Sequence, residues 1–328
     1  MNKLLINLLV LVLVSALGLG LLEAAVRKLM PWYDPARQVS FHLNPDGVTL
    51  GMPGDIIRQR TPKGDYDLFS RFNRYGFRDD KDLAQSVQGD IFVLGDSFSF
   101  GWGVADGQRY SDRLEQLLGR PVFNISIPSD IRGYQKLLAY ARSRGARVSS
   151  LVLGLCMEND IHDYTIPEAP ANVATTASLR TVDWRAFLKN HSAVYLAFSY
   201  ELQKVPLLRK SLERTGLARD LEGLVHKNVL DEKELKSSRD EIMAMLRSLD
   251  KAVVLIIPSR MLWTGAHHDA ELAVHERMVA LLRQAGLEVV DMKPWFEKDG
   301  HPLDYYFRTD PHWNQAGHEL AARALFEY

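Results

Sequence analysis

From Ile91 onward the sequence alternates short apolar runs with longer segments of helical periodicity, and this alternation constrains the fold more than any other feature. Each apolar run is too short for a helix and is typical of a buried strand. Strands that alternate with helices form parallel sheets with helices on both faces. The sequence therefore predicts an α/β fold with a parallel five-stranded sheet. The predicted strands are Ile91–Leu94, Val122–Ile125, Leu151–Leu155, Val253–Ile257 and Glu288–Val290, and the helical patterns are Tyr110–Leu118, Tyr134–Arg142, Ala270–Gln284 and Asn314–Phe326.

The interval between the third and fourth predicted strands is far too long for a simple crossover connection. It has helical patterns of its own near Trp184–Gln203 and Asp231–Leu249. We predict a main domain over residues 91–328 with a mostly helical insertion at about 160–250, which would cover the active site or hold a partner. Residues 31–90 are rich in Pro, Gly, Asp and Arg with little periodicity, and predict an irregular flanking segment.

The N-terminus carries an apolar stretch from Leu4 to Leu22. A helix needs roughly 20 apolar residues to cross a bilayer, so residues 1–30 predict a single transmembrane anchor. A cleaved signal peptide is the alternative, because Ala16-Leu-Gly18 offers small residues at a plausible processing site. Basic residues lie on both sides of the stretch, so charge alone does not fix its orientation.

Bulk charge and cysteine content exclude several classes of function. The formal net charge is −1, from 40 basic and 41 acidic residues, so no nucleic-acid partner is expected. The single cysteine, Cys156, can form neither an internal disulfide nor a cysteine metal cluster. The sequence carries no signature of a metal site or a cofactor, and we expect neither.

A candidate nucleophile follows the first predicted strand in the run Gly95-Asp-Ser97. Ligands bind at the carboxyl ends of the strands in open parallel sheets, which is where Ser97 would lie. A nucleophilic serine needs a base within hydrogen-bond reach and a third group that orients the base. Asp310-Pro-His312, just before the last helical pattern, supplies both from one turn. Taken alone, this tripeptide also fits a helix-capping turn with a solvated histidine.

Two further polar runs follow predicted strands and are candidates for an oxyanion hole. Glu158-Asn159-Asp160 comes after the third strand, and an asparagine amide there can donate to a developing oxyanion. Asn124-Ile-Ser126 ends the second strand, and the backbone N–H of Ser126 is the other candidate donor.

These four runs, in this order, resemble the four sequence blocks of the SGNH/GDSL hydrolase superfamily. The resemblance implies a flavodoxin-like sheet, with Ser97 as nucleophile and partial oxyanion donor, Ser126 and Asn159 as the other donors, His312 as base and Asp310 as its orienter. The chain departs from the family pattern at Ser126 and Met157, where the family usually has glycine.

Two features narrow the resemblance. The extended first block, Gly95–Val104, and the earlier run Asn73–Arg78 resemble a membrane-anchored bacterial branch of the superfamily. One residue separates Asp310 from His312 instead of the commoner two, which is similar to alginate-type polysaccharide O-acetyltransferases and implies an O-acetyl group on a carbohydrate. Candidate substrate-contacting residues are Arg78, Trp102, Asp160 and Trp313.

Several functions remain open at this point. The same residues serve an esterase, if water accepts the acyl group, and an O-acyltransferase, if a sugar hydroxyl does. A lipase or thioesterase with an apolar cleft, and a non-catalytic carbohydrate-binding scaffold, are further alternatives. The resemblance and the anchor together predict a single-pass protein of the bacterial inner membrane with its catalytic domain in the periplasm, working with a carbohydrate or acyl-ester substrate and a membrane partner that donates acyl groups.

Overall fold

The structure, a computed structural model, describes residues 3–35, 38–61, 64–166, 184–203, 231–264 and 267–328. Internal contacts divide the chain into two compact units. The first comprises residues 1–39 and 169–219, and the second comprises residues 40–168 and 220–328. The candidate catalytic residues all belong to the second unit.

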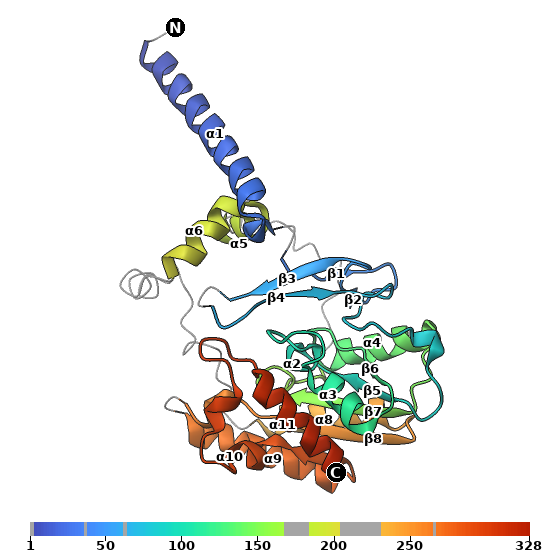
Figure 1. Ribbon diagram of the computed structural model, residues 1–328. Helices are drawn as coiled ribbons and strands as arrows, with labels where there is room; N and C mark the ends of the chain where they lie inside the picture. The colour runs from blue at the N-terminus through green and yellow to red at the C-terminus, as the bar shows by residue number, and fades with distance from the viewer. Residues whose placement is uncertain (1–2, 36–37, 62–63, 167–183, 204–230, 265–266) are drawn as a thin grey trace. The chain divides into compact units, whose positions relative to one another are not determined.

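The second unit is built on a parallel five-stranded sheet with the spatial order β6-β5-β7-β8-β9 (Figure 1). In chain order this is 2-1-3-4-5, the flavodoxin-like arrangement, in which ligands bind beyond the carboxyl ends of the strands. The predicted fold class and all five predicted strands are confirmed. The strands are β5 (Ile91–Leu94), β6 (Val122–Asn124), β7 (Ser150–Cys156), β8 (Lys251–Ile257) and β9 (Glu288–Asp291).

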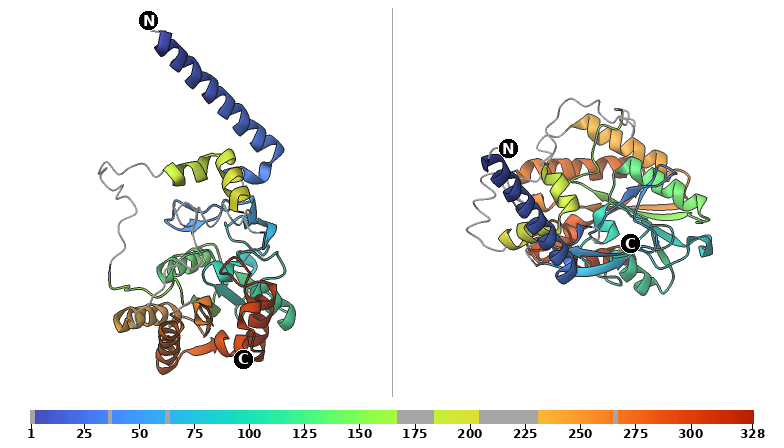
Figure 2. Two further views of the ribbon diagram at one scale, coloured as in Figure 1. Left: turned by 90° about the vertical axis from the view of Figure 1, so that its left-hand side faces the viewer. Right: turned by 90° about the horizontal axis from the view of Figure 1, so that it is seen from above.

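Helices cover both faces of this sheet, which Figure 2 shows from two further directions. α3 packs against α11, whereas α8 packs against both α4 and α9. The helices are α2 (Ser97–Phe100), α3 (Tyr110–Leu118), α4 (Ile131–Ser143), α8 (Glu232–Leu246), α9 (His268–Gln284), α10 (Met292–Glu297) and α11 (Gln315–Glu327), with short 3-10 turns η3 (Leu83–Gln85), η5 (Arg260–Leu262) and η6 (Pro302–Tyr305).

The apolar strand residues form the core because both faces of the sheet are covered. Val93, Val152, Leu255 and Val290 all belong to one buried cluster, and Val93 lies opposite Val152 in the β5–β7 ladder. Each such side chain contributes about 1.5–3 kcal/mol to folding when it is removed from water. Continuous apolar runs, instead of alternating ones, are the expected pattern for strands buried on both faces.

Residues 31–90 are less irregular than the sequence predicts. They contain two antiparallel pairs, β1 (His42–Leu43) with β2 (Thr49–Leu50) and β3 (Ile56–Arg60) with β4 (Asp67–Arg71). The alternation of buried and exposed residues along β3 is short and includes polar Gln59 and Arg60, which hides it in the sequence. The β3–β4 hairpin belongs to the second unit and contributes to the candidate site.

The region predicted as a helical insertion is divided between the two units. α8 lies between β7 and β8 in the chain and packs on α4 and α9, so it is part of the α/β body. α5 (Trp184–His191) and α6 (Ala193–Gln203) belong to the first unit. Residues 167–183 and 204–230 of the predicted insertion lie outside the described residues.

The first unit contains the N-terminal helix α1 (Lys3–Leu29), the turn η1 (Pro31–Tyr33), α5 and α6. Glu23 near the end of α1 accepts hydrogen bonds from Ser192 Oγ at 2.9 Å and from the backbone N–H of Ala193 at 2.7 Å, and so caps α6. Residues Leu5–Leu29 are long and apolar enough to cross a membrane, with a mean hydropathy of 2.7 over the most apolar window. A helix of this kind serves either as an anchor or as a signal sequence.

Candidate active site

Ser97 lies at the carboxyl end of β5, as the first residue of the short helix α2. Asp96 caps this helix, because its Oδ1 accepts a hydrogen bond from the backbone N–H of Phe98 at 2.9 Å. Gly95 makes the tight turn possible, since a Cβ at this position would lie 2.3 Å from Ser99 Oγ and 2.8 Å from the Gly154 carbonyl oxygen. The turn leaves Ser97 partly accessible, while Asp96 and Ser99 beside it are fully buried.

The structure brings His312 and Asp310 to Ser97 from the loop that precedes α11. His312 Nε2 lies 2.8 Å from Ser97 Oγ, and His312 Nδ1 lies 2.5 Å from Asp310 Oδ1. The same Asp310 oxygen accepts the backbone N–H of His312 at 3.0 Å. A carboxylate accepts only, so Nδ1 carries the proton and Nε2 is left as the acceptor of the Ser97 hydroxyl proton.

The charges around His312 suit a base. Burial alone lowers the pKa of His312, but the hydrogen bond and negative charge of Asp310, with smaller contributions from Asp96 and Glu158, outweigh burial and raise it. For Asp310, burial raises the pKa, and the hydrogen bond and charge of His312 outweigh burial and lower it. Asp310 is therefore a carboxylate that stabilises the imidazolium form of His312.

Tyr66 is a site residue that the sequence did not reveal. It lies in the β3–β4 hairpin, and its hydroxyl donates to Asp310 Oδ2 at 3.0 Å while it accepts the indole N–H of Trp102 at 2.7 Å. The Trp102 ring is stacked on His312, with ring centroids 6.0 Å apart and an interplanar angle of 25°. Trp102 thus lies beside His312, and its role as a substrate contact stays a prediction.

Arg260 is a second residue that the sequence did not reveal. Its Nη1 donates to the carbonyl oxygens of Phe307 at 3.0 Å and of Asp310 at 3.3 Å, so it holds the loop that carries Asp310 and His312. Glu158 in turn holds Arg260 in place, since its Oε1 accepts hydrogen bonds from Ser259 Oγ at 2.9 Å and from the Arg260 backbone N–H at 3.2 Å. Glu158 therefore has a structural role next to Asn159.

Of the two predicted oxyanion donors besides Ser97, the structure favours Asn159 over Ser126. Asn159 is exposed, and its Nδ2 donates to Asp96 Oδ2 at 3.2 Å, which holds the amide next to the residue that precedes Ser97. The backbone N–H of Ser126 donates to Asn124 Oδ1 at 2.9 Å, and Ser126 is 1% exposed. The prediction for Ser126 is wrong, because its N–H already has a partner.

Arg78 is not a substrate contact either. Its side chain is 2% exposed and donates to the carbonyl oxygens of Gly101 at 2.6 Å and Val104 at 2.7 Å, and to Asp106 at 2.8 Å. Burial lowers the pKa of Arg78 to about 10, a value at which it is still charged at neutral pH. Arg78 therefore stabilises the loop that follows α2 through hydrogen bonds on the buried side of that loop.

Asp160 and Trp313 were also predicted as substrate contacts, and both are completely buried. Asp160 accepts hydrogen bonds from the Tyr134 hydroxyl at 2.8 Å and from the backbone N–H of Cys156 at 2.7 Å. Trp313 packs edge-on against Phe98 and belongs to the main core cluster. Their roles are structural. Among the described residues, no group of three or more His, Cys, Asp or Glu side chains is arranged to hold a metal ion.

Comparison with known proteins gives one family match. Residues 232–327, which include Asp310 and His312, match the family described as "SGNH hydrolase-like domain, acetyltransferase AlgX". No curated protein matches the sequence.

Among solved structures, a lipolytic protein of the G-D-S-L family from Veillonella parvula is 14% identical, with 73% of this chain and 96% of that chain covered and a TM-score of 0.39. An acetylxylan esterase from Geobacillus stearothermophilus, crystallised as a catalytic mutant, is 11% identical over 75% of this chain and 95% of that chain, with a TM-score of 0.40. The family match covers the last two strands of the sheet and the loop that carries Asp310 and His312. The match spans 96 of the 328 residues, and it shows that this part of the chain is similar to an SGNH hydrolase-like domain.

Proposed function

We propose that the protein cleaves O-acyl esters, and specifically O-acetyl groups on a carbohydrate, through an acyl intermediate on Ser97. The observation that carries this proposal is the continuous hydrogen-bond chain from Ser97 Oγ to His312 Nε2 at 2.8 Å and from His312 Nδ1 to Asp310 at 2.5 Å. A serine hydroxyl is a weak nucleophile unless such a base removes its proton.

In the first half of the reaction, Ser97 Oγ attacks the acyl carbonyl carbon while His312 Nε2 takes the hydroxyl proton. The carbonyl oxygen becomes an oxyanion, to which the backbone N–H of Ser97 and the amide of Asn159 donate. The tetrahedral intermediate then breaks the bond to the sugar oxygen, and His312 returns its proton to that oxygen. The products are a free sugar hydroxyl and an acyl ester on Ser97.

In the second half, an acceptor O–H attacks the acyl-serine carbonyl carbon as His312 takes its proton. The bond to Ser97 Oγ breaks, and the proton passes to this oxygen. Water as acceptor gives hydrolysis, and a sugar hydroxyl gives an O-acetyltransferase. The second outcome is supported by the family match, whose description names an acetyltransferase, and by the single residue between Asp310 and His312.

We also propose that α1 anchors the protein in the bacterial inner membrane with the catalytic unit in the periplasm. The support is the apolar length of Leu5–Leu29, together with the carbohydrate substrate proposed above, since polysaccharides are modified outside the cytoplasm. A membrane-bound acyl donor would then be the natural partner. Fusing a periplasm-dependent phosphatase to the C-terminus should give an active reporter, and an inactive phosphatase in well-expressed protein would place the catalytic unit in the cytoplasm.

The experiment that tests the chemistry is product analysis with the purified full chain, an activated acetyl ester and a neutral oligosaccharide. Released acetate reports hydrolysis, and acetylated sugar reports transfer. Ser97→Ala should lower the rate of both by several orders of magnitude. Ser126→Ala is the matched control, because it removes a hydroxyl at the same sheet edge that His312 does not contact, and it should leave the rate close to that of the wild type.

A fluorophosphonate probe, which reacts with activated serines, gives an independent readout. It should label the wild type and Ser126→Ala, but not Ser97→Ala. A folded wild-type protein that resists the probe, or a Ser97→Ala variant that retains activity, would contradict the acyl-serine mechanism and favour a non-catalytic carbohydrate-binding protein.

A further inference from the structure

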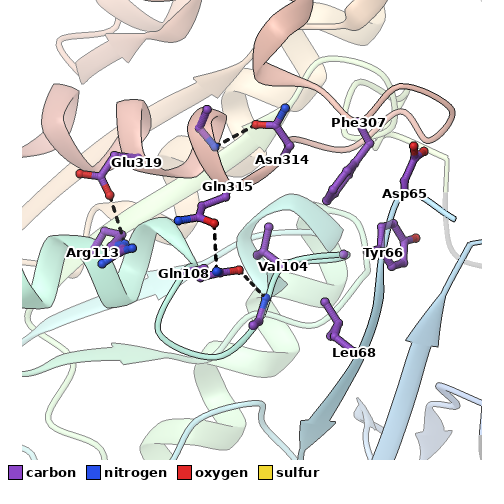
Figure 3. Close-up of a pocket in the computed structure, with 13 residues that line it drawn as sticks. Asp65, Tyr66, Leu68, Val104, Gln108, Arg113, Phe307, Asn314, Gln315 and Glu319 are labelled. Carbon is purple, nitrogen blue, oxygen red and sulfur yellow. Dashed lines mark hydrogen bonds and ion pairs between the residues drawn. The ribbon is translucent and has the colours of Figure 1, made fainter.

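A surface groove of about 880 Å³ lies next to the candidate active site in the second unit (Figure 3). The β3–β4 hairpin and the loop after α2 form one side of it, and the segment from Phe307 to the first turns of α11 forms the other. Its volume falls within the range of about 300–1,000 Å³ that is usual for ligand pockets. Neither Ser97 nor His312 lines it, so it is separate from the catalytic residues themselves.

One end of the groove adjoins the catalytic residues. Tyr66 and Phe307 lie at this end in Figure 3, and Arg113 and Glu319 lie at the other. The Tyr66 hydroxyl donates to Asp310 at 3.0 Å and accepts the indole N–H of Trp102, the ring stacked on His312. A ligand lying along the groove would therefore have one end beside the catalytic histidine.

The groove combines aromatic rings with side-chain amides. The rings of Tyr66 and Phe307 lie 4.9 Å apart between centroids. Gln108 Nε2 donates to Gln315 Oε1 at 3.0 Å in the middle of the groove, and within the described residues the amide nitrogen of Gln315 has no hydrogen-bond partner. Amides both donate to and accept from hydroxyl groups, and rings present apolar surface to the C–H faces of sugars.

The charges of the groove favour a neutral ligand over an anionic one. The lining carries the carboxylates of Asp65 and Glu319 and one guanidinium, that of Arg113. Arg113 is already paired with Glu319, with Nε 3.1 Å from the nearest carboxylate oxygen. A polyanionic chain would meet a carboxylate excess in the lining, whereas a neutral chain would meet only hydrogen-bonding groups.

We propose that this groove is a binding subsite for a neutral carbohydrate chain, which it holds so that an acetylated sugar reaches Ser97. The proposal rests on the proposed function, because it names where and how that carbohydrate is held. It predicts that long substrates gain affinity from the groove and that small acetyl esters do not.

The test is to obstruct the groove without touching the catalytic residues. Ala316 is exposed in the first turn of α11 and lines the groove, so Ala316→Trp should fill it. Ala273→Trp, at an exposed alanine of α9 outside the groove, is the matched control. For acetylated xylohexaose, Ala316→Trp should lower kcat/KM by about tenfold or more, chiefly through KM, and Ala273→Trp should not. For p-nitrophenyl acetate, both variants should match the wild type.

Equal kcat/KM of Ala316→Trp and wild type on acetylated xylohexaose would overturn the subsite. Equal or better use of an acetylated oligomannuronate, an anionic chain of the same length, would overturn its preference for neutral chains. Calorimetric titration of unacetylated xylohexaose into each protein tests the binding subsite separately from the proposed acyl-serine chemistry. If the wild type binds xylohexaose and Ala316→Trp does not, the subsite stands even if p-nitrophenyl acetate is not cleaved, and only the proposed chemistry fails.

Discussion

The Tyr66→Phe substitution should slow the reaction through Asp310. It removes one hydroxyl that donates to Asp310 Oδ2 at 3.0 Å and accepts from Trp102 at 2.7 Å. The hydrogen bond is one of the interactions that lower the pKa of Asp310. A hydrogen bond to a charged group is worth about 1.5–3 kcal/mol. Asp310 stays bound to His312 through its other oxygen, so we take the lower value, which corresponds to about a tenfold loss of kcat.

The assay is the hydrolysis of p-nitrophenyl acetate, because this small ester reports the chemistry of Ser97 without contacts along the groove. We expect a lower kcat with little change in KM. Tyr140→Phe is the matched control: Tyr140 is also 8% exposed, and its hydroxyl donates to the Tyr75 carbonyl oxygen at 3.2 Å. That variant loses a comparable buried hydrogen bond away from the site and should keep the wild-type kcat.

A double-mutant cycle with Asp310→Asn tests whether Tyr66 acts through Asp310. If it does, Tyr66→Phe should cost little further activity once Asp310 is already an amide, so the two effects will be far from additive. Fully additive losses would show that Tyr66 acts by general support of the fold. An unchanged kcat in the single variant would refute the reasoning altogether.

Three other variants probe the rest of the site. Activity requires neutral His312, so its raised pKa should place the acid limb of the pH–rate profile at a higher pH than the pKa of an ordinary histidine. Asp310→Asn should move this limb to lower pH and reduce kcat by about 10⁴. Asn159→Ala should lower kcat by about 10²–10³ on a small ester if its amide holds the oxyanion, and an unchanged kcat would remove it from that role. Arg78→Met leaves two loop carbonyls without their donor and should lower the free energy of unfolding in urea by about 2–4 kcal/mol, whereas Arg74→Met, at an exposed arginine, should leave it nearly unchanged.

The elements of the fold could be predicted from the sequence because their signals are local. β5 begins and ends at the predicted residues, and α3 matches its predicted range. The predicted pattern Asn314–Phe326 agrees with α11, which Asn314 caps: its Oδ1 accepts the backbone N–H groups of Ala316 at 2.8 Å and Gly317 at 3.2 Å. Ser97 and His312 each lie where a motif meets an element boundary, and the structure brings Ser97 Oγ and His312 Nε2 to 2.8 Å from each other, while their catalytic roles stay predictions.

The errors concern residues whose burial or partners depend on tertiary packing. Trp313 follows His312 directly, yet its ring turns into the core while His312 faces Ser97. The prediction of Ser126 as an oxyanion donor is wrong because the side chain of Asn124, two residues earlier, accepts the backbone N–H of Ser126. Arg78 is a charged residue in a loop, a type that is normally exposed, and its burial depends on carbonyls more than twenty residues further along the chain.

The β3–β4 hairpin shows most clearly why the site extends beyond the motifs. Gln59 on β3 accepts the backbone N–H of Gly103 at 2.8 Å, and Asp65 accepts that of Thr309 at 2.8 Å. The hairpin thus holds the loop after the nucleophile and the loop that carries Asp310, with Tyr66 between them. Ser97 and His312 are 215 residues apart in the sequence, and the hairpin is hydrogen-bonded to the loops that follow the one and precede the other. The segment before the sheet is therefore part of the candidate active site.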